Sequence, residues 1–205
     1  AGHVKKVKPL KPFDAETWTL SNGIKVIYKH MDKNPYLFQV AATSVGGKSM
    51  VQTEDLPVTL VIDELANNCG VADYTALELK QIMNGKGVSL KTSLGEMAES
   101  INGYCSISEV EELMQLLHLR LTEPRFDRKS YNDFMNSYQG MLKSMQTSVK
   151  KITADSVITA MYDHNPRLVF KNDETISKVN FQDYQRVYKE RFGNAGDFTF
   201  YMIGN

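Results

Sequence analysis

The N-terminal part of the chain alternates apolar and polar residues in the manner of β-strands, and after Pro57 the apolar positions recur with a helical period. Two β-prone runs within residues 17–30 flank a Ser-Asn-Gly sequence at residues 21–23, whose positive-φ residues suit a tight hairpin turn. A third strand is expected over residues 37–44. The apolar stripe that follows predicts a helix ending at Gly70. Its members are Val58, Val61, Ile62, Leu65 and Cys69.

In the middle and C-terminal parts of the chain, segments with strand-like alternation again give way to segments with a helical period. Two capping boxes, one at residues 75–78 and one at residues 108–111, each predict the start of a helix, and Pro124 ends the second of these helices. The last strand has apolar residues on both faces, which is typical of a central position in a sheet. The remaining expected elements are strands over residues 88–92, 97–105 and 198–203, and helices over residues 127–150, 154–162 and 181–192.

The order of these elements predicts an α+β fold. Strands occur in runs joined by short turns, so the sheet is expected to be mostly antiparallel, with the helices packed on one side. At 205 residues and 42% hydrophobic content, the chain is long enough to bury one sizeable core, and residues 16–205 are predicted to form a single domain. Residues 1–15 are predicted to be an extended, solvated linker, because their lysines are interspersed with Pro9 and Pro12.

Charge and cysteine content exclude several classes of protein. Lys plus Arg equals Asp plus Glu at 24 each, so no net field favours nucleic acid or an anionic membrane, and no apolar run reaches the length of a membrane span. Cys69 and Cys105 match no metal spacing and are predicted to be buried small hydrophobes rather than a disulfide. No signal peptide opens the sequence, and no compartment is predicted. We expect a segment of a longer polypeptide, with any targeting signal upstream.

Several short segments of the sequence occur in a characteristic order. They are the opening hairpin Trp18 to Val26, the glycine pair Gly46-Gly47, the helix ending at Gly70, the stretch Pro124 to Asp127, and the stretch Phe192 to Phe200. In order and spacing they resemble the insulinase/pitrilysin family of zinc metallopeptidases, which includes the mitochondrial processing peptidases. The resemblance implies the metallopeptidase/LuxS-like fold. It also implies a clamshell of two homologous halves, each of two related domains, with this chain similar to the third domain, at the start of the non-catalytic half.

The family's zinc motif reads His-x-x-Glu-His, in which two imidazoles one helical turn apart bind the metal and the glutamate activates its water. Placing Gly70 on the family's glycine puts the two histidine positions at Val61 and Leu65, whereas the glutamate remains as Glu64. The third ligand, a glutamate, should fall near residues 140–142, where no carboxylate occurs. The resemblance therefore implies no catalytic residue, metal ligand or cofactor site in this chain, and zinc in a partner half.

The residues themselves agree with this interpretation. The four histidines, His3, His30, His118 and His164, are not paired at the spacings that zinc sites use. Glu64 is expected to be a solvated carboxylate rather than a general base, because no metal-bound water is there to activate. Two functions of different class follow. The chain is either a non-catalytic domain that helps a zinc-bearing half to enclose peptide substrates, or an inactive relative that serves as an assembly scaffold.

Overall fold

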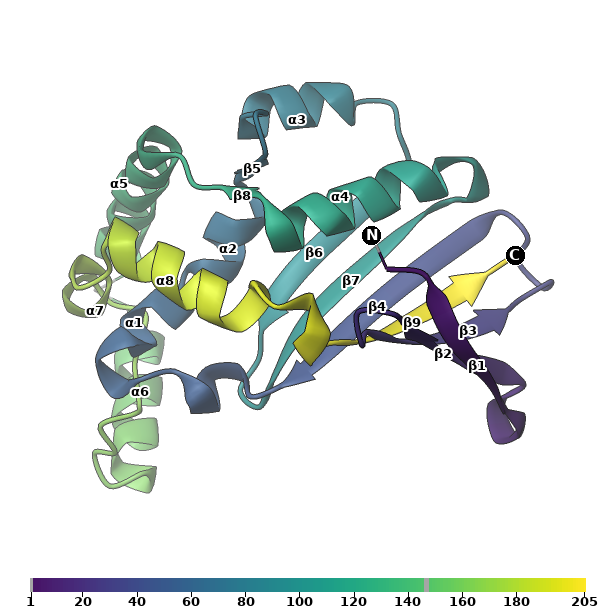
Figure 1. Cartoon of the computed structure of the whole chain (residues 1–205). Coiled ribbons are helices and arrows are strands. Elements are labelled where there is room, and N and C mark those ends of the chain that lie inside the picture. Colours follow the sequence, from purple (N-terminus) through teal and green to yellow (C-terminus); the bar gives the residue numbers. More distant parts are fainter. Residues whose placement is uncertain (1, 146–147) are drawn as a thin grey trace.

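A computed structural model describes residues 2–145 and 148–205, and most of its strands form one seven-stranded sheet (Figure 1). The strands of this sheet are β1 (Val4–Leu10), β2 (Ala15–Leu20), β3 (Lys25–His30), β4 (Leu37–Val45), β6 (Ser89–Leu94), β7 (Ala98–Ser106) and β9 (Thr199–Gly204). A small second sheet pairs β5 (Gly70–Val71) with β8 (Pro124–Arg125). The helices are α1 (Leu56–Thr59), α2 (Ile62–Asn67), α3 (Ala76–Ile82), α4 (Val110–Thr122), α5 (Arg128–Met145), α6 (Val149–Met161), α7 (Asp173–Ser177) and α8 (Phe181–Phe192).

The large sheet has the strand order β1-β2-β3-β9-β4-β7-β6. Its neighbouring strands run antiparallel, except that β3 and β9 are parallel. The C-terminal strand β9 therefore lies in the middle of the sheet, as its apolar residues on both faces predicted. The α+β class and the mostly antiparallel sheet are both confirmed.

One face of the sheet forms the core. Along β4, alternate residues are buried, from Phe38 through Val40 and Ala42, whereas Gln39 and Thr43 between them are exposed. Helices α4 and α8 lie in front of the sheet in Figure 1 and cover this buried face. This alternation is what a sheet packed against helices on one side requires. The helices also pack on one another, as α1 and α2 both contact α8.

Residues 4–10 correct the predicted linker over residues 1–15. They form the edge strand β1, which pairs with β2 through contacts such as Val7 with Trp18 and Lys8 with Thr17. An edge strand tolerates exposed lysine and proline, because one of its two rows of backbone groups faces solvent. The lysines and prolines that indicated a solvated tether are therefore equally typical of this strand.

The helix boundaries also differ from the prediction. The helix expected up to Gly70 is split into α1 and α2 by a turn at residues 60 and 61, where Val61 has φ −129°. The long helix expected over residues 127–150 ends at Met145, and α6 begins at Val149 rather than at residue 154. Residues 146 and 147 of the expected helix lie outside the described residues.

Of the two predicted capping boxes, only the first is present. At α3 the Thr75 hydroxyl accepts a hydrogen bond from the Glu78 amide, and the Glu78 carboxylate accepts one from the Thr75 amide. At α4 no side chain caps the helix. The Glu109 carboxylate instead accepts from the Ser106 hydroxyl at 2.7 Å and from the Gly87 amide at 3.0 Å, and these two bonds lower the pKa of Glu109.

Candidate functional site

The two positions at which the resemblance places zinc-binding histidines are part of the hydrophobic core. Val61 is 0% exposed and Leu65 is 6% exposed, and both belong to the same cluster of buried residues. They lie one helical turn apart, since the Leu65 amide donates to the Val61 carbonyl at 3.0 Å. The spacing of a metal-binding pair is thus kept, but each side chain that would bind the metal is a hydrocarbon.

The other two elements of the family's site are equally unsuited to zinc. Glu64 is half-exposed, at 44% of its side chain, and its carboxylate lies 3.5 Å from the ammonium of Lys171. This is the solvated carboxylate that the sequence predicted, now with an ion-pair partner. Within residues 140–142, Gly140 is exposed and Leu142 is 3% exposed in the core. Hydrocarbon at Val61 and Leu65, and the lack of a carboxylate within residues 140–142, leave these positions without the donors that zinc prefers.

The same turn of α2 covers the free edge of the sheet at β6. The Asp63 carboxylate accepts from the Leu94 amide and from the Ser93 hydroxyl, both at 2.8 Å. The Asn67 side chain donates to the Thr92 carbonyl and accepts from the Thr92 amide, both at 2.9 Å. Edge strands bind extended peptides through such backbone groups. Over residues 92–94, therefore, α2 already occupies the groups that a peptide strand would need.

A buried arginine fixes the C-terminal end of α2. Arg120, on α4, is 7% exposed, and its guanidinium donates to the carbonyls of Ala66 and Cys69 at 3.0 and 2.9 Å. The same nitrogen lies 2.7 Å from the Cys69 sulfur. A cation at a helix C-terminus interacts favourably with the helix dipole and satisfies carbonyls that have no partner within the helix. Cys69 is buried, and burial raises the pKa of its thiol, which lowers the fraction of reactive thiolate.

A second buried charge holds the glycine pair after β4. Glu99 is 1% exposed, and one of its carboxylate oxygens accepts from the Gly47 amide at 3.1 Å and lies 3.3 Å from the Arg191 guanidinium. Gly47 has φ +59°, and a Cβ there would meet the Gly95 carbonyl at 2.4 Å. The glycine is required by this close approach of two backbones. Sequence reasoning missed both Glu99 and Arg120, because their partners lie more than fifty residues away along the chain.

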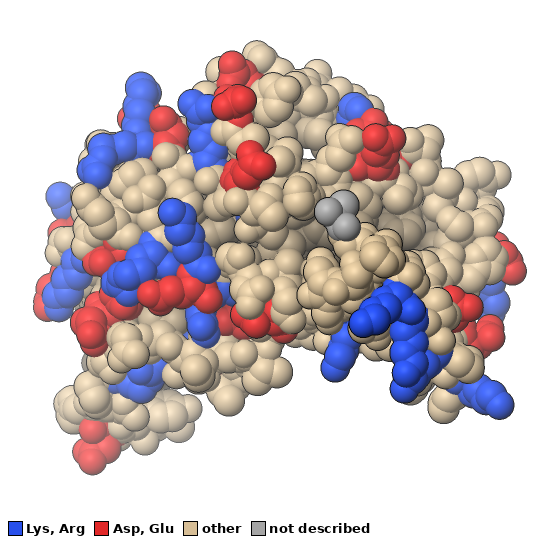
Figure 2. Space-filling model, viewed as in Figure 1, with Lys and Arg blue, Asp and Glu red and all other residues tan. Residues whose placement is uncertain are grey.

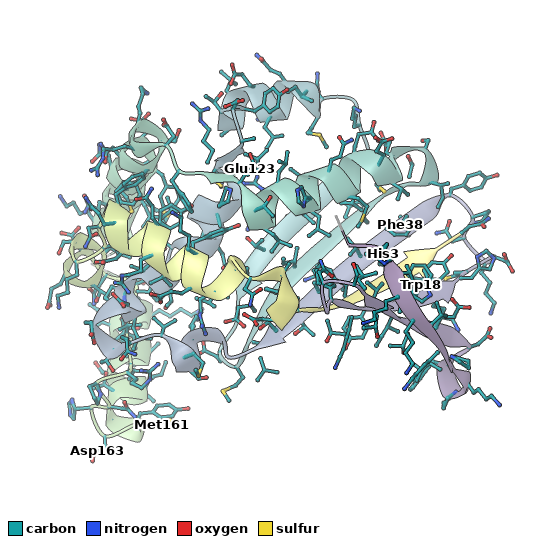
Figure 3. The ribbon with its side chains drawn as sticks, viewed as in Figure 1. His3, Trp18, Phe38, Glu123, Met161 and Asp163 are labelled. Atoms are coloured by element: carbon teal, nitrogen blue, oxygen red, sulfur yellow. The ribbon has the colours of Figure 1, made fainter. Side chains whose placement is uncertain are left out.

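The histidines lie on separate parts of the fold. His3 precedes β1 (Figure 3), His30 ends β3, His118 is on α4, and His164 follows α6. All four are exposed. Among the residues that the structure describes, no cluster of three or more histidines, cysteines or acidic residues has the arrangement to hold a metal ion. The two cysteines are buried and unpaired, as predicted.

Comparisons with known proteins show what the sequence and the fold are similar to. No protein-family model matches the chain. The chain is 21% identical over 200 residues to the probable zinc protease PqqL of Haemophilus influenzae, a match that covers 94% of this chain and 20% of that protein. It thus spans about a fifth of the length of this relative.

Solved structures share the fold. The periplasmic protease PqqL from Escherichia coli has a TM-score of 0.83 at 18% identity, over 100% of this chain and 22% of that one. A mutant of the ferredoxin protease FusC, solved in complex with Arabidopsis ferredoxin, has a TM-score of 0.78 at 19% identity, over 100% of this chain and 22% of that one. A peptidase M16 inactive domain from Pseudomonas fluorescens has a TM-score of 0.74 at 16% identity, over 93% of this chain and 46% of that one.

The fold is therefore that of an M16 peptidase domain. The sequence is similar to that of a probable zinc protease, and the fold is shared with an inactive M16 domain. None of the helices that the structure describes is long and apolar enough to cross a membrane.

Proposed function

We propose that the chain is a non-catalytic domain of a larger zinc metallopeptidase and forms part of the wall of a chamber that encloses peptide substrates. The observation that carries this proposal is the buried pair Val61 and Leu65, which fills with hydrocarbon the place of the family's histidines. The surrounding helices and sheet keep the family's fold, with a TM-score of 0.83 to PqqL. A domain that keeps the fold and lacks the ligands is suited to enclosing a substrate but not to hydrolysing it.

The mechanism that we propose is enclosure. The residues of this chain do not fit zinc, so the metal and the glutamate that activates its water belong to the zinc-bearing half. Closure of the two halves around an unfolded peptide would exclude bulk water and limit the size of the substrate. Holding a flexible peptide beside the reacting groups also removes an entropic cost from the chemical step. The expected partners are the zinc-bearing half, on the same or a paired polypeptide, and the peptide substrate.

The alternative is an assembly scaffold, in which both halves have lost their metal. The buried Val61 and Leu65 are compatible with it, because they describe only this domain. The match to a zinc protease over 94% of the chain favours the first function, a domain of an active metallopeptidase, over the scaffold.

An assay of the full-length parent protein distinguishes the two functions. The chamber proposal predicts about one bound zinc ion per parent chain, measured by mass spectrometry of the purified protein, and hydrolysis of an unfolded peptide that a chelator abolishes. The scaffold alternative predicts neither. A parent with no zinc site, and with no hydrolysis after zinc is supplied, would contradict the chamber proposal.

A further inference from the structure

The face of the large sheet that the helices leave uncovered carries lysines. Strand pairing fixes which side chains share this face, because residues paired across adjacent strands project to the same side. One row of paired residues crosses the sheet from Lys91 on β6, through Asn102, Ala41, Tyr201 and Ile27, and reaches Lys8 on β1. Lysine thus stands at both ends of a row that spans all seven strands.

Adjacent rows add three more lysines to this face. Lys25 and Lys29 on β3 pair with residues 199 and 203 of β9, and Lys6 on β1 pairs with Thr19. None of the ion pairs among residues 2–145 and 148–205 involves these five lysines. The Lys29 ammonium donates to the Phe13 carbonyl, so the charges available to a ligand are those of the other four lysines, Lys6, Lys8, Lys25 and Lys91.

Carboxylates are missing from the same face. Among the described strands of the sheet, the acidic residues are Glu16 and Glu99, and their pairing with Tyr28 and Ser44 places both on the opposite face. The whole chain has equal numbers of basic and acidic residues. The lysines of the open face therefore do not come from an overall excess of basic residues, but from basic and acidic residues lying on different parts of the surface. Figure 2 shows the helix side of the molecule, where basic side chains gather over the end that contains β1 and both signs mix over α5 and α8. The open face lies on the far side of this view.

The part of the open face formed by β9, β4, β7 and β6 is hollowed and less polar. A groove of about 420 Å³ is lined by residues that include Gln39, Asn102, Tyr104, Tyr201 and Ile203. The amides of Gln39 and Asn102 each offer a donor and an acceptor, which matches the groups of a peptide backbone. The aliphatic and aromatic side chains beside them fit apolar residues of a ligand.

These features favour a polypeptide over a nucleic acid. The described strands of the large sheet contain no arginine, the residue whose planar fork binds phosphate in two places. The neutral chain lacks the basic balance of nucleic-acid-binding domains. Because Asp63 and Asn67 cover the β6 edge over residues 92–94, a peptide cannot add there as a further strand.

We infer that the open sheet face binds an extended polypeptide segment that has acidic residues on both sides of an apolar stretch. Lys91 and Lys8 are six strand spacings apart, or about 29 Å, which an extended chain spans with about nine residues. The inferred ligand therefore carries its acidic groups about nine residues apart. The inference concerns the chain's own surface and holds whether or not a zinc-bearing half exists.

Fluorescence polarisation of a labelled synthetic peptide tests this inference on the 205-residue chain. The peptide has glutamates at both ends of an apolar centre, and a second peptide has glutamine at the same positions. We expect the glutamate peptide to bind and the glutamine peptide to bind at least about tenfold more weakly, with the difference lost at about 0.5 M salt. The variant Lys25→Glu/Lys91→Glu is expected to bind the glutamate peptide at least about tenfold more weakly than the parent chain.

The matched control is Lys80→Glu/Lys143→Glu, which makes the same change of charge at exposed positions on α3 and α5. We expect it to lose less than about twofold in affinity, and circular dichroism should show both variants folded. Equal losses in the two variants would overturn the inference, because they would show an effect of net charge alone. Equal binding of both peptides, no binding, tighter binding of a single-stranded oligonucleotide, or self-association of the chain through this face would also overturn it.

Discussion

The double substitution Val61→His/Leu65→His is expected to destabilise the chain by about 2–6 kcal/mol, because each buried imidazole without a partner costs on the order of 1–3 kcal/mol. Both side chains are within the core, at 0% and 6% exposure, and no metal ligand nearby compensates for the change. A folded domain is stable by only about 5–15 kcal/mol, so this loss is a large fraction of the total. Urea denaturation should show a much lower midpoint with an unchanged slope.

The control for this prediction is Val45→His/Leu77→His, which makes the same two chemical changes on the surface. Val45 is 92% exposed and Leu77 is 67% exposed, so each change is expected to alter the free energy of unfolding by no more than about 0.5 kcal/mol. If the two double variants unfold at the same urea concentration, the positions of Val61 and Leu65 are not packed. The placement of the family's histidines at these residues would then be wrong.

Deletion of residues 1–205 from the parent polypeptide is expected to abolish peptide cleavage while zinc stays bound. The proposed reason is that the ligands belong to the other half, whereas positioning of a flexible peptide and exclusion of water need the facing wall. We expect the rate of hydrolysis of a quenched fluorescent peptide to fall at least about 100-fold, with about one zinc ion per chain before and after the deletion. The deletion starts at residue 1 because β1 belongs to the sheet.

Addition of the 205-residue chain to the deleted parent should restore part of the activity, since two separately folded halves can associate through their interface. The destabilised Val61→His/Leu65→His chain is the matched control and should restore little. A deleted parent that cleaves peptides at the full rate would contradict the chamber function and favour the scaffold.

Much of the fold follows from local sequence patterns. The strand β7 and the helix α8 are where alternation and helical period placed them, because each has one buried face. The hairpin of β2 and β3 is where its β-prone runs and turn residues placed it. The central position of β9 follows from apolar residues on both of its faces. The edge strand β1 did not follow, because an edge strand and a solvated linker share the same lysines and prolines.

The candidate site also has some features that the sequence predicts and others that only the structure shows. The resemblance places the family's two histidines at Val61 and Leu65, and the burial of these two residues follows from the helical stripe. The contacts of Arg120 with the end of α2, and of Glu99 with Gly47, are not visible in the sequence. A buried charge and a surface charge look alike in one sequence, and only the folded chain brings such distant partners together.

The grouping of lysines on the open sheet face could not be predicted from the sequence either. Its lysines occur on β1, β3 and β6, and they share a face only because of the strand order and the pairing register. Alternation within each strand predicts two faces, but not which strands are neighbours. The row from Lys91 to Lys8 is therefore a property of the fold.

A zinc titration of the isolated 205-residue chain by isothermal calorimetry tests whether this domain has any metal site of its own. With hydrocarbon at Val61 and Leu65 and four exposed histidines on separate elements, we expect no stoichiometric site of micromolar or better affinity, and no peptide hydrolysis in the presence of zinc. One zinc ion bound per chain with a dissociation constant of about 1 μM or lower would contradict the proposal that this chain is a non-catalytic domain.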